Sequence, residues 1–467
     1  MELISLYKRV IGLDVHQAQI TACALIEGPD GTTQIERRTF GAFKRDRRAL
    51  ADWCASHTPD LVVMESTGIY WKSPYAYLEK VGIRAIVVNA RHVKQVPGRK
   101  TDVADAEWLA TLARAGLLRA SFVPPAKLRS LRLVSRQCQK LGGQLSSEKN
   151  RLGKVLADAG IRLGVVVSDL HGKSARAMTK ALIDGATPEA ALVHASKQLK
   201  APRKEIEAAL DGELGATERF VATEILRHIE ELEAQIARFD KHLLDNLSEP
   251  VELNALALLQ TIPGVDRIGA AMLLVEIGIT MSDFRGADAL ASWSGLCPGN
   301  NESAGKRRHG KSRKGNPYAR RLLCEFANAA IKTRCAIQAK YQALVIRRGR
   351  KRAIIACAHK MLRIIFHMLS RKQAYRDTTV DIEALIVKRN APRWIRALTP
   401  RLLALCRRHP GRRASRPAQL RGAVSISPGA SVMVTWACSE AGHPSEPKPA
   451  IVRFEARQVV LSLRVGG

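Results

Sequence analysis

Residues 10–40 read VIGLDVHQAQITACALIEGPDGTTQIERRTF and decide the fold of the first part of this 467-residue chain. They contain three runs with strand character, at Val10–Val15, Ile20–Ile26 and Thr32–Phe40. The turn-rich link Glu27-Gly28-Pro29-Asp30-Gly31 separates the last two runs. Runs of this length bounded by short turns predict three consecutive antiparallel strands.

Helix and strand patterns alternate after this meander. We predict a helix over Lys44–Ser56, a strand over Leu61–Glu65, a helix over Ile69–Val81, a strand over Arg84–Val88 and a helix over Asp102–Leu117. Hairpin strands followed by alternating helices and strands indicate a mixed sheet with helices on its faces. We therefore expect residues 1–125 to form an α/β domain.

Residues 126–245 have the pattern of long helices. Apolar residues step by three and four along two segments, at Leu131, Val134, Cys138, Leu141 and Leu145 and at Ile225, Ile229, Leu232, Ile236, Phe239 and Leu243. Such heptad seams are typical of a coiled-coil linker, whose helices pair with each other or with a second protomer. A simple helical core explains the same pattern, because three heptads are near the minimum for a coiled coil.

The C-terminal half is predicted to be mostly helical. Two apolar helices flank the turn Pro263-Gly264-Val265, in a helix-hairpin-helix pattern that can offer backbone N–H groups to a DNA phosphate. Asp266 stands in this turn where a small residue would suit the approach of a phosphate better, which favours a mainly structural hairpin instead. We expect residues 246–400 to form one domain, helical again from about residue 317 to 371. Residues 401–467, rich in Arg, Pro, Ser and Gly, are expected to form a loosely ordered or appended tail.

The net charge of the chain is +32, from 75 Lys and Arg against 43 Asp and Glu. Residues 1–125 and 126–245 carry +4 each, residues 246–375 carry +14 and residues 376–467 carry +10. A surplus gathered in one half indicates a polyanionic partner, since a merely solvated face mixes both signs. We expect the basic residues between positions 306 and 321 to contact nucleic acid. They are Lys306, Arg307, Arg308, Lys311, Arg313, Lys314, Arg320 and Arg321.

Composition also excludes several classes of protein. A hydrophobic content of 46% is too high for a wholly disordered basic tail. Nine cysteines without a CxxC pair predict reduced thiols and no zinc site. Because no run approaches about 18 apolar residues and no leader pattern opens the chain, we expect a cytoplasmic protein without membrane contact.

Four acidic residues stand at places where chemistry is expected. Asp14 interrupts an apolar strand and Glu65 ends another, while Asp102 and Asp105 are three apart at a helix start and share one face. Carboxylates converging in this way can bind two divalent cations and leave room for a phosphate. Each acid also has a simpler interpretation, since Asp102 can be a helix N-cap and Asp105 suits a first turn.

Residues 291–322, ASWSGLCPGNNESAGKRRHGKSRKGNPYARRL, predict an exposed basic loop around Ser303. Gly, Pro and Asn exclude a regular helix until about Pro317. A serine that attacks a phosphodiester needs its alkoxide stabilised and the phosphate charge neutralised, and Lys306, Arg307 and Arg308 are near in sequence. A serine in a polar loop is more often a simple turn residue, and the local sequence alone leaves that interpretation open.

Asp14 in GLDVH, Glu65 in MESTG, and Asp102 with Asp105 in KTDVADAEWLA resemble the DEDD signature of a RuvC-like, RNase H-type domain. Over residues 8–400 the chain is similar to insertion-sequence transposases of the DEDD class, which are described as bridge-RNA-guided serine recombinases, and to the related Piv-type DNA invertases. The resemblance implies Mg²⁺ bound by the four acids, a noncoding guide RNA, and a homo-oligomer, dimer or tetramer, whose protomers can share one active site.

The resemblance extends to the serine. Gly295, Leu296 and Pro298 match a GLxP segment that a serine-glycine-rich stretch follows in the family. Ser303 stands at the place of the nucleophile, although Glu302-Ser303-Ala304-Gly305 departs from the usual serine pair with two glycines. Ser312 is the fallback.

The resemblance thus implies a transposase that cuts and rejoins DNA through a phosphoserine link. A Piv-type invertase, a RuvC-like nuclease or junction resolvase that uses metal-activated water, and a non-catalytic nucleic-acid-binding protein are the alternatives.

Overall fold

The computed structural model describes residues 5–66, 68–90, 93, 105–299, 301–303, 306–309, 312, 314–377, 421–427, 431–437, 449–455 and 458–459. The chain divides into two compact units. One unit comprises residues 1–325 with 362–375, and the other comprises residues 326–361 with 376–467.

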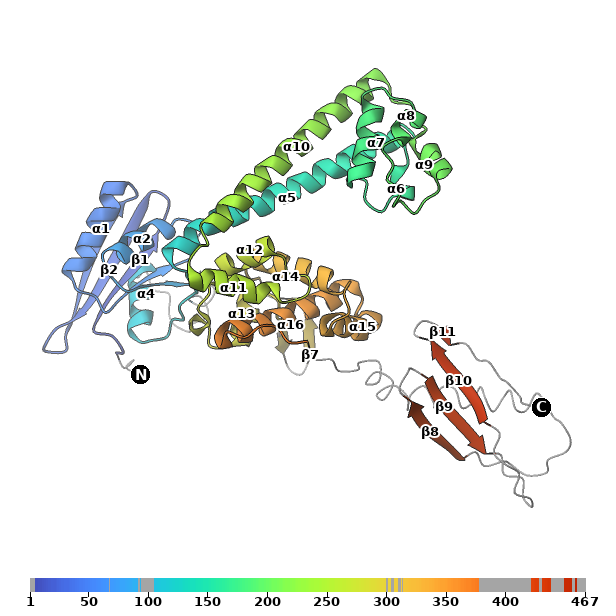
Figure 1. The fold of residues 1–467 in the computed structure, drawn as a ribbon. Helices are drawn as coiled ribbons and strands as arrows, with labels where there is room; N and C mark the ends of the chain where they lie inside the picture. The colour runs from blue at the N-terminus through green and yellow to red at the C-terminus, as the bar shows by residue number, and fades with distance from the viewer. Residues whose placement is uncertain are drawn as a thin grey trace, which may run out of the picture. The chain divides into compact units, whose positions relative to one another are not determined.

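A five-stranded mixed sheet forms the centre of the N-terminal domain (Figure 1). The strand order is β3-β2-β1-β4-β5. The strands are β1 Arg9–Val15, β2 Gln19–Glu27, β3 Thr33–Gly41, β4 Leu61–Glu65 and β5 Ala85–Val88. β2 is antiparallel to β1 and β3, whereas β4 is parallel to β1 and β5. The predicted meander and mixed sheet are confirmed, with strand ends within one residue of the prediction.

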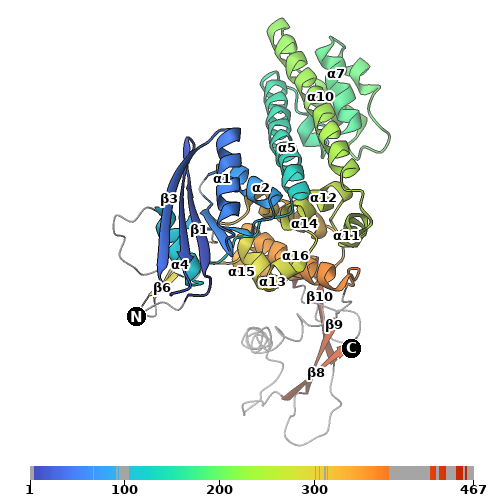
Figure 2. The ribbon, with the colours of Figure 1, turned by 90° about the vertical axis from the view of Figure 1, so that its left-hand side faces the viewer.

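Helices cover both faces of this sheet. On one face, Ile11 and Leu13 of β1 pack in a cluster with residues of α1 Lys44–Ser56 and α2 Lys72–Lys80. Figure 2 shows these two helices beside the sheet. On the other face, Val10 packs in a cluster with α4 Asp105–Arg114. Because side chains alternate along a strand, the sequence pattern of β1 assigns each residue to one of these faces.

Gly12 permits α4 to lie directly against β1. A Cβ atom at Gly12 would lie 1.9 Å from the carbonyl oxygen of Ala106 and 2.8 Å from the backbone nitrogen of Ala110. Any larger residue would therefore collide with the backbone of α4. This close approach brings the first turn of α4, including Asp105, to the sheet.

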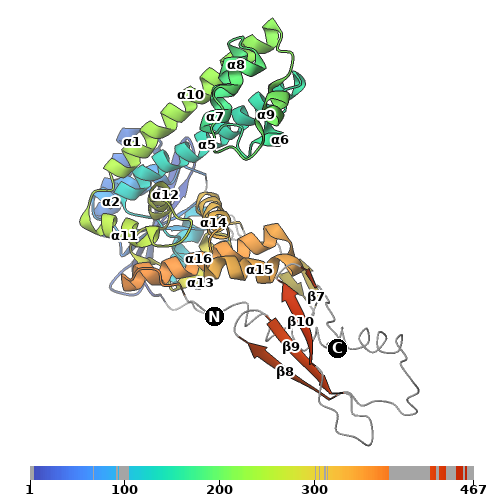
Figure 3. The same ribbon diagram turned by 45° about the vertical axis from the view of Figure 1, so that its right-hand side comes forward.

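Two long helices, α5 Ala126–Asp158 and α10 Ala216–Asp245, run side by side in opposite directions (Figures 1 and 3). Cross-helix contacts follow this direction, with Cys138 Sγ 3.2 Å from Asp240 Oδ1 and Lys149 Nζ 2.9 Å from Glu233 Oε1. The two predicted helices are confirmed, and they pair with each other; a coiled-coil supercoil stays a prediction. Four shorter helices at their far end pack around one apolar cluster: α6 Leu163–Val166, α7 Lys173–Ile183, α8 Pro188–Leu192 and α9 Arg203–Leu210.

The predicted pair of apolar helices corresponds to α11 Pro250–Gln260 and α12 Arg267–Ile277. Asp266 is the N-cap of α12, and its Oδ1 accepts a hydrogen bond of 3.2 Å from the backbone N–H of Gly269. This cap agrees with a structural role for the hairpin, whereas a phosphate contact stays a prediction. The remaining described helices after α12 are η1 Met281–Asp283, α13 Ala287–Trp293, α14 Pro317–Ala330, α15 Ala336–Arg348 and α16 Arg350–Arg371.

Part of the C-terminal segment, for which a loosely ordered or appended tail was expected, forms strands. β8 Arg421–Ser427, β9 Ser431–Ala437, β10 Pro449–Glu455 and β11 Gln458–Val459 form a four-stranded antiparallel sheet. Runs such as SVMVTWA and PAIVRFE are rich in residues that favour strands. The prediction of a tail rested instead on the overall content of Arg, Pro, Ser and Gly, which hides these short runs. Among the described residues, only α16 is long and apolar enough to cross a membrane by length and composition, and half of its apolar stretch is buried.

Candidate active site

Strand register brings Asp14 and Glu65 to neighbouring positions. β1 and β4 are parallel, and their register pairs Leu13 with Met64. The next residue along each strand is an acid, Asp14 in β1 and Glu65 at the end of β4. In parallel neighbours, residues at the same register share a face of the sheet. The two carboxylates therefore belong to one end and one face of the sheet.

That face is the one that α4 covers. Leu13 and Met64 pack in the cluster on the α1 and α2 face, so the acids that follow them face the opposite side. There the helix begins with Asp105, one residue before the Ala106 carbonyl that touches Gly12. Asp14 and Glu65 thus share one end and one face of the sheet, and α4, which begins with Asp105, packs on that face. The fourth predicted acid, Asp102, lies outside the described residues.

The chemistry of these donors fits a hard divalent cation, because carboxylate oxygens are the ligands that Mg²⁺ takes in proteins. Among the residues that the structure describes, no three His, Cys, Asp or Glu side chains stand close enough to hold a metal ion. Asp14 instead pairs with His16, whose Nε2 lies 3.0 Å from Asp14 Oδ2. The Asp14 side chain is 24% exposed, so solvent and ligands reach it. His16 was missed in the sequence, where its only signal was its position two residues after Asp14.

Ser303 lies in a short β-hairpin, which the predicted exposed loop without a regular helix did not specify. β6 Asn301–Ser303 pairs antiparallel with β7 Lys306–His309, with a bulge between Asn301 and Glu302. The register sets Ser303 opposite Lys306. Gly and Asn exclude a helix here but not a hairpin, and two residues containing a glycine between two strands are a hairpin signal.

The base of this hairpin is closed by backbone contacts. The N–H of Asn316 donates to the carbonyl oxygen of Trp293 at 3.0 Å. A Cβ atom at Gly315 would lie 2.3 Å from the backbone nitrogen of Gly295, so only glycine allows this approach. Between the base and the hairpin, Pro298 and the half-buried Ser312 form an isolated β-bridge. Residues 295–316 therefore leave and re-enter the helical domain at one point.

The predicted nucleic-acid-binding residues occupy several settings. Lys306, Arg307 and Arg308 lie in β7, whereas Lys311 and Arg313 lie outside the described residues. Lys314 is exposed and Arg320 is half-buried.

The last of these residues, Arg321, has protein partners. It pairs with Glu325 at 2.9 Å and donates to the carbonyl oxygen of Gln139 at 3.2 Å. Arg321 is therefore engaged within the protein, in addition to any contact with nucleic acid.

A buried polar network adjoins the hairpin base. Glu276 of α12 is fully buried, and both of its carboxylate oxygens accept hydrogen bonds from Arg136 of α5, at 2.7 and 2.8 Å. Asn316 Nδ2 donates to the same carboxylate at 2.6 Å. Arg132 donates to the Val275 carbonyl at 2.9 Å, and burial lowers the pKa of its guanidinium to about 10. The sequence signal for this network is the single charge in the apolar run MLLVEIG.

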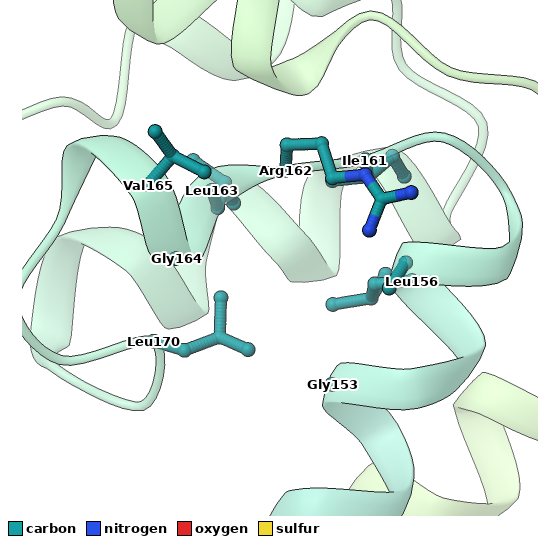
Figure 4. A pocket seen from close by; sticks show the side chains of 9 residues that line it. Gly153, Leu156, Ile161, Arg162, Leu163, Gly164, Val165 and Leu170 are labelled. Carbon is teal, nitrogen blue, oxygen red and sulfur yellow. The ribbon is translucent and has the colours of Figure 1, made fainter.

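One pocket of about 210 Å³ lies at the far end of the two long helices (Figure 4). Leu156, Leu163 and Leu170 are among its lining side chains, with Arg162 as its charged member. None of the predicted site residues lines it, so the candidate active site is elsewhere.

Comparisons with known proteins show which parts of the chain have relatives. Residues 11–161 match a transposase family model for the DEDD domain of IS110 elements, and residues 256–342 match the model of the transposase IS116/IS110/IS902 family. The chain is 26% identical over 339 residues to a probable family 20 transposase of Pseudomonas aeruginosa, covering 71% of this chain and 90% of that protein. It is 33% identical over 122 residues to the transposase for insertion sequence element IS1111A of Coxiella burnetii, covering 25% of this chain and 33% of that protein. Solved structures that resemble it include Thermus thermophilus RuvC, with 12% identity, a TM-score of 0.19, and coverage of 24% of this chain and 99% of that one.

The two family matches and the named relatives define the chain as a DNA transposase. The N-terminal domain that carries Asp14, Glu65 and Asp105 and the second matched region occur in the order that the sequence resemblance implied. Residues 11–161 and 256–342 are similar to the two matched regions of DEDD transposases of the IS110 type.

Proposed function

We propose that this transposase cleaves and rejoins DNA strands through a covalent link to Ser303, with Mg²⁺ held by Asp14, Glu65, Asp102 and Asp105. The observation that carries the metal site is the register of β1 and β4, which gathers two acids beside the first turn of α4. The hairpin register, with Ser303 opposite Lys306 in a basic segment, supports the serine assignment.

In the proposed reaction, Ser303 Oγ attacks the phosphorus of a phosphodiester and loses its proton. The P–O bond to the leaving sugar oxygen breaks, and that oxygen takes up a proton. Lysine and arginine charges beside the serine lower the cost of the added negative charge at phosphorus. The hydroxyl of the second DNA strand then attacks the phosphoserine, which joins the strands and regenerates the serine. Bound Mg²⁺ would supply Lewis-acid stabilisation of phosphate oxygens at the four carboxylates.

We further propose an element-encoded noncoding RNA as guide and a homo-oligomer as the working form. The charge distribution supports two nucleic-acid partners, since residues 246–375 carry +14 and residues 376–467 carry +10. DNA and a guide RNA together present more phosphate groups than a contact with a single DNA duplex does. Each neutralised phosphate needs its own lysine or arginine side chain. Sequencing RNA that co-purifies with the protein tests this part.

Denaturation-resistant protein–DNA complexes test the serine directly. The transposase is incubated with element-end DNA and Mg²⁺, and the products are separated under denaturing conditions. We expect wild type and Ser312→Ala to form the complex and Ser303→Ala to form none. A complex that persists with Ser303→Ala contradicts the assignment of the nucleophile.

A metal-dependent nuclease without a serine nucleophile is the second candidate. The position of the acids favours it, because they gather at the sheet independently of the hairpin. It predicts that Ser303→Ala still cleaves DNA and that no enzyme form traps a covalent complex. Asp14→Asn should abolish cleavage under both mechanisms. A non-catalytic DNA-binding protein predicts instead that this substitution leaves every activity of the protein intact.

A further inference from the structure

We propose that Glu276 is a positioning residue for the Ser303 hairpin, which it holds through the side chain of Asn316. The inference rests on the proposed function, in which Ser303 attacks DNA, and it adds the residues that fix the place of that serine. Glu276 and Asn316 do not touch the reacting atoms in this account. They determine where the two ends of the hairpin segment leave the helical domain.

The Glu276 carboxylate is held rigidly. It is fully buried in a helix that is otherwise apolar after Arg267, and it receives two parallel hydrogen bonds from Arg136, in the bidentate geometry that orients a carboxylate most strongly. A buried charge of this kind is tolerated only with its partners in place, and loss of one partner is strongly destabilising. An apolar side chain would fill the same space at lower cost, so the presence of a buried carboxylate at this point indicates a task other than stability.

Asn316 transmits this position to the hairpin. Its Nδ2 donates to Glu276 at 2.6 Å, while its Oδ1 accepts the backbone N–H groups of Tyr318 and Ala319 at 3.0 and 3.2 Å. The same residue caps α14 and donates its own N–H to Trp293. Every polar atom of the Asn316 side chain is therefore engaged. The start of α14 and the end of α13 meet at this one residue.

The surroundings fix Trp293 as well. Its ring lies 5.8 Å from that of Phe284 and 5.7 Å from that of Phe122. The Arg132 guanidinium lies over the Phe122 and Trp293 rings at 5.8 and 5.9 Å. Arg136 lies over the ring of Tyr318 at 4.6 Å. Both sides of the hairpin base are thus packed against arginines of α5, the helix that also orients Glu276.

The same α5 provides a matched control. Lys127 pairs with Glu252 at 2.7 Å, and the Glu252 side chain is only 4% exposed. This ion pair joins α5 to α11, as the Arg136 pair joins α5 to α12, but Asn316 and the hairpin have no part in it. Both pairs thus join α5 to a buried glutamate, although Lys127 is 40% exposed. If such pairs served stability alone, disruption of either pair would affect DNA chemistry equally.

The test is a reciprocal exchange of side chains in the full-length protein. Asn316→Asp keeps a good N-cap but sets a carboxylate against Glu276, and Glu276→Gln removes the charge that Arg136 holds. The double variant Asn316→Asp with Glu276→Gln restores one donor and one acceptor with the original charge. A cycle of this kind isolates the pairwise interaction from the separate effects of each change.

Two readouts are measured, the rate of covalent complex formation at saturating DNA and the hydrogen exchange of backbone amides in residues 301–309. We expect Asn316→Asp to slow complex formation by about 10- to 100-fold, as a misplacement of about 1 Å does, and to raise exchange in the hairpin. The double variant should recover most of both, and DNA affinity should change little. Glu252→Gln should lower the melting temperature without slowing the reaction.

Three results would overturn the inference. The single variants could react at the wild-type rate, the double variant could be no better than the worse single variant, or Glu252→Gln could slow the reaction equally. Failure of the proposed function looks different, because wild type then forms no covalent complex or Ser303→Ala still forms one. The exchange measurement tests the Asn316 contact even in that case.

Discussion

Replacing Gly12 by alanine should displace α4 from the sheet and disturb the acidic site. The added Cβ would lie 1.9 Å from the Ala106 carbonyl oxygen and 2.8 Å from the Ala110 nitrogen. Both atoms belong to the helix backbone, so no side chain can rotate away. A carbon atom does not come within 3.0 Å of such atoms, so α4 must move by about 1 Å.

The cost follows from overpacking of a closely packed interior, which is typically about 1–3 kcal/mol. Because backbone atoms receive the collision, we expect a value near the upper limit, about 3 kcal/mol, which corresponds to roughly 150-fold in a local opening equilibrium. Hydrogen exchange of peptides that cover residues 105–114 measures this opening. The same shift moves Asp105 relative to Asp14, so the concentration of Mg²⁺ needed for half-maximal cleavage should rise.

Gly142→Ala is the control. Gly142 lies within α5, and a Cβ atom there meets nothing within 4 Å. Alanine is favoured over glycine inside a helix by about 0.5–1 kcal/mol, so this variant should be slightly more stable than wild type. If Gly12→Ala left exchange in α4 and the requirement for Mg²⁺ unchanged, the proposed packing of α4 beside the acids would be refuted.

Three further predictions concern other parts of the chain. Burial alone would raise the pKa of Glu233, but hydrogen bonds from Arg176 and Lys149 outweigh it and hold the pKa below its ordinary value. The stability that the Glu233 charge contributes is complete above about pH 4.3, the pKa of a glutamate in the unfolded chain, and is lost as the pH falls through the lower pKa of Glu233 in the folded protein. Glu233→Gln should therefore reduce the fall of the melting temperature at acid pH. Burial raises the pKa of Cys54 to about 12, and its alkylation at about pH 8 should require unfolding, as peptide mass spectrometry can check. Gly315→Ala should open the hairpin base and raise hydrogen exchange in residues 301–309, whereas unchanged exchange would contradict the close backbone approach.

The sheet and its acids were predictable because the relevant signals are local. Alternation and turn residues marked β1 to β5, and Asp14 and Glu65 stood out as charges in apolar strands. The sequence could not supply the register that pairs Leu13 with Met64. Gly12 was also missed, since its significance depends on a helix that packs on it from about one hundred residues away.

The serine segment shows a different limit. Gly, Pro and Asn correctly excluded a helix around Ser303, but the short strands β6 and β7 are held at a base formed by Gly295, Gly315 and Asn316. This base depends on Glu276, an acid within an apolar run. Its partners come from α5 and from the start of α14, and no pattern of period two or 3.6 connects such positions.

The most direct test of the account is to identify the residue that becomes linked to DNA. Wild-type protein is allowed to react with element-end DNA, the covalent complex is digested, and the modified peptide is sequenced by mass spectrometry. We expect the modified peptide to carry a nucleotide on Ser303, formed with Mg²⁺ and absent in Asp14→Asn. A nucleotide on Ser312 or any other residue, or strand joining without a covalent intermediate, would contradict it.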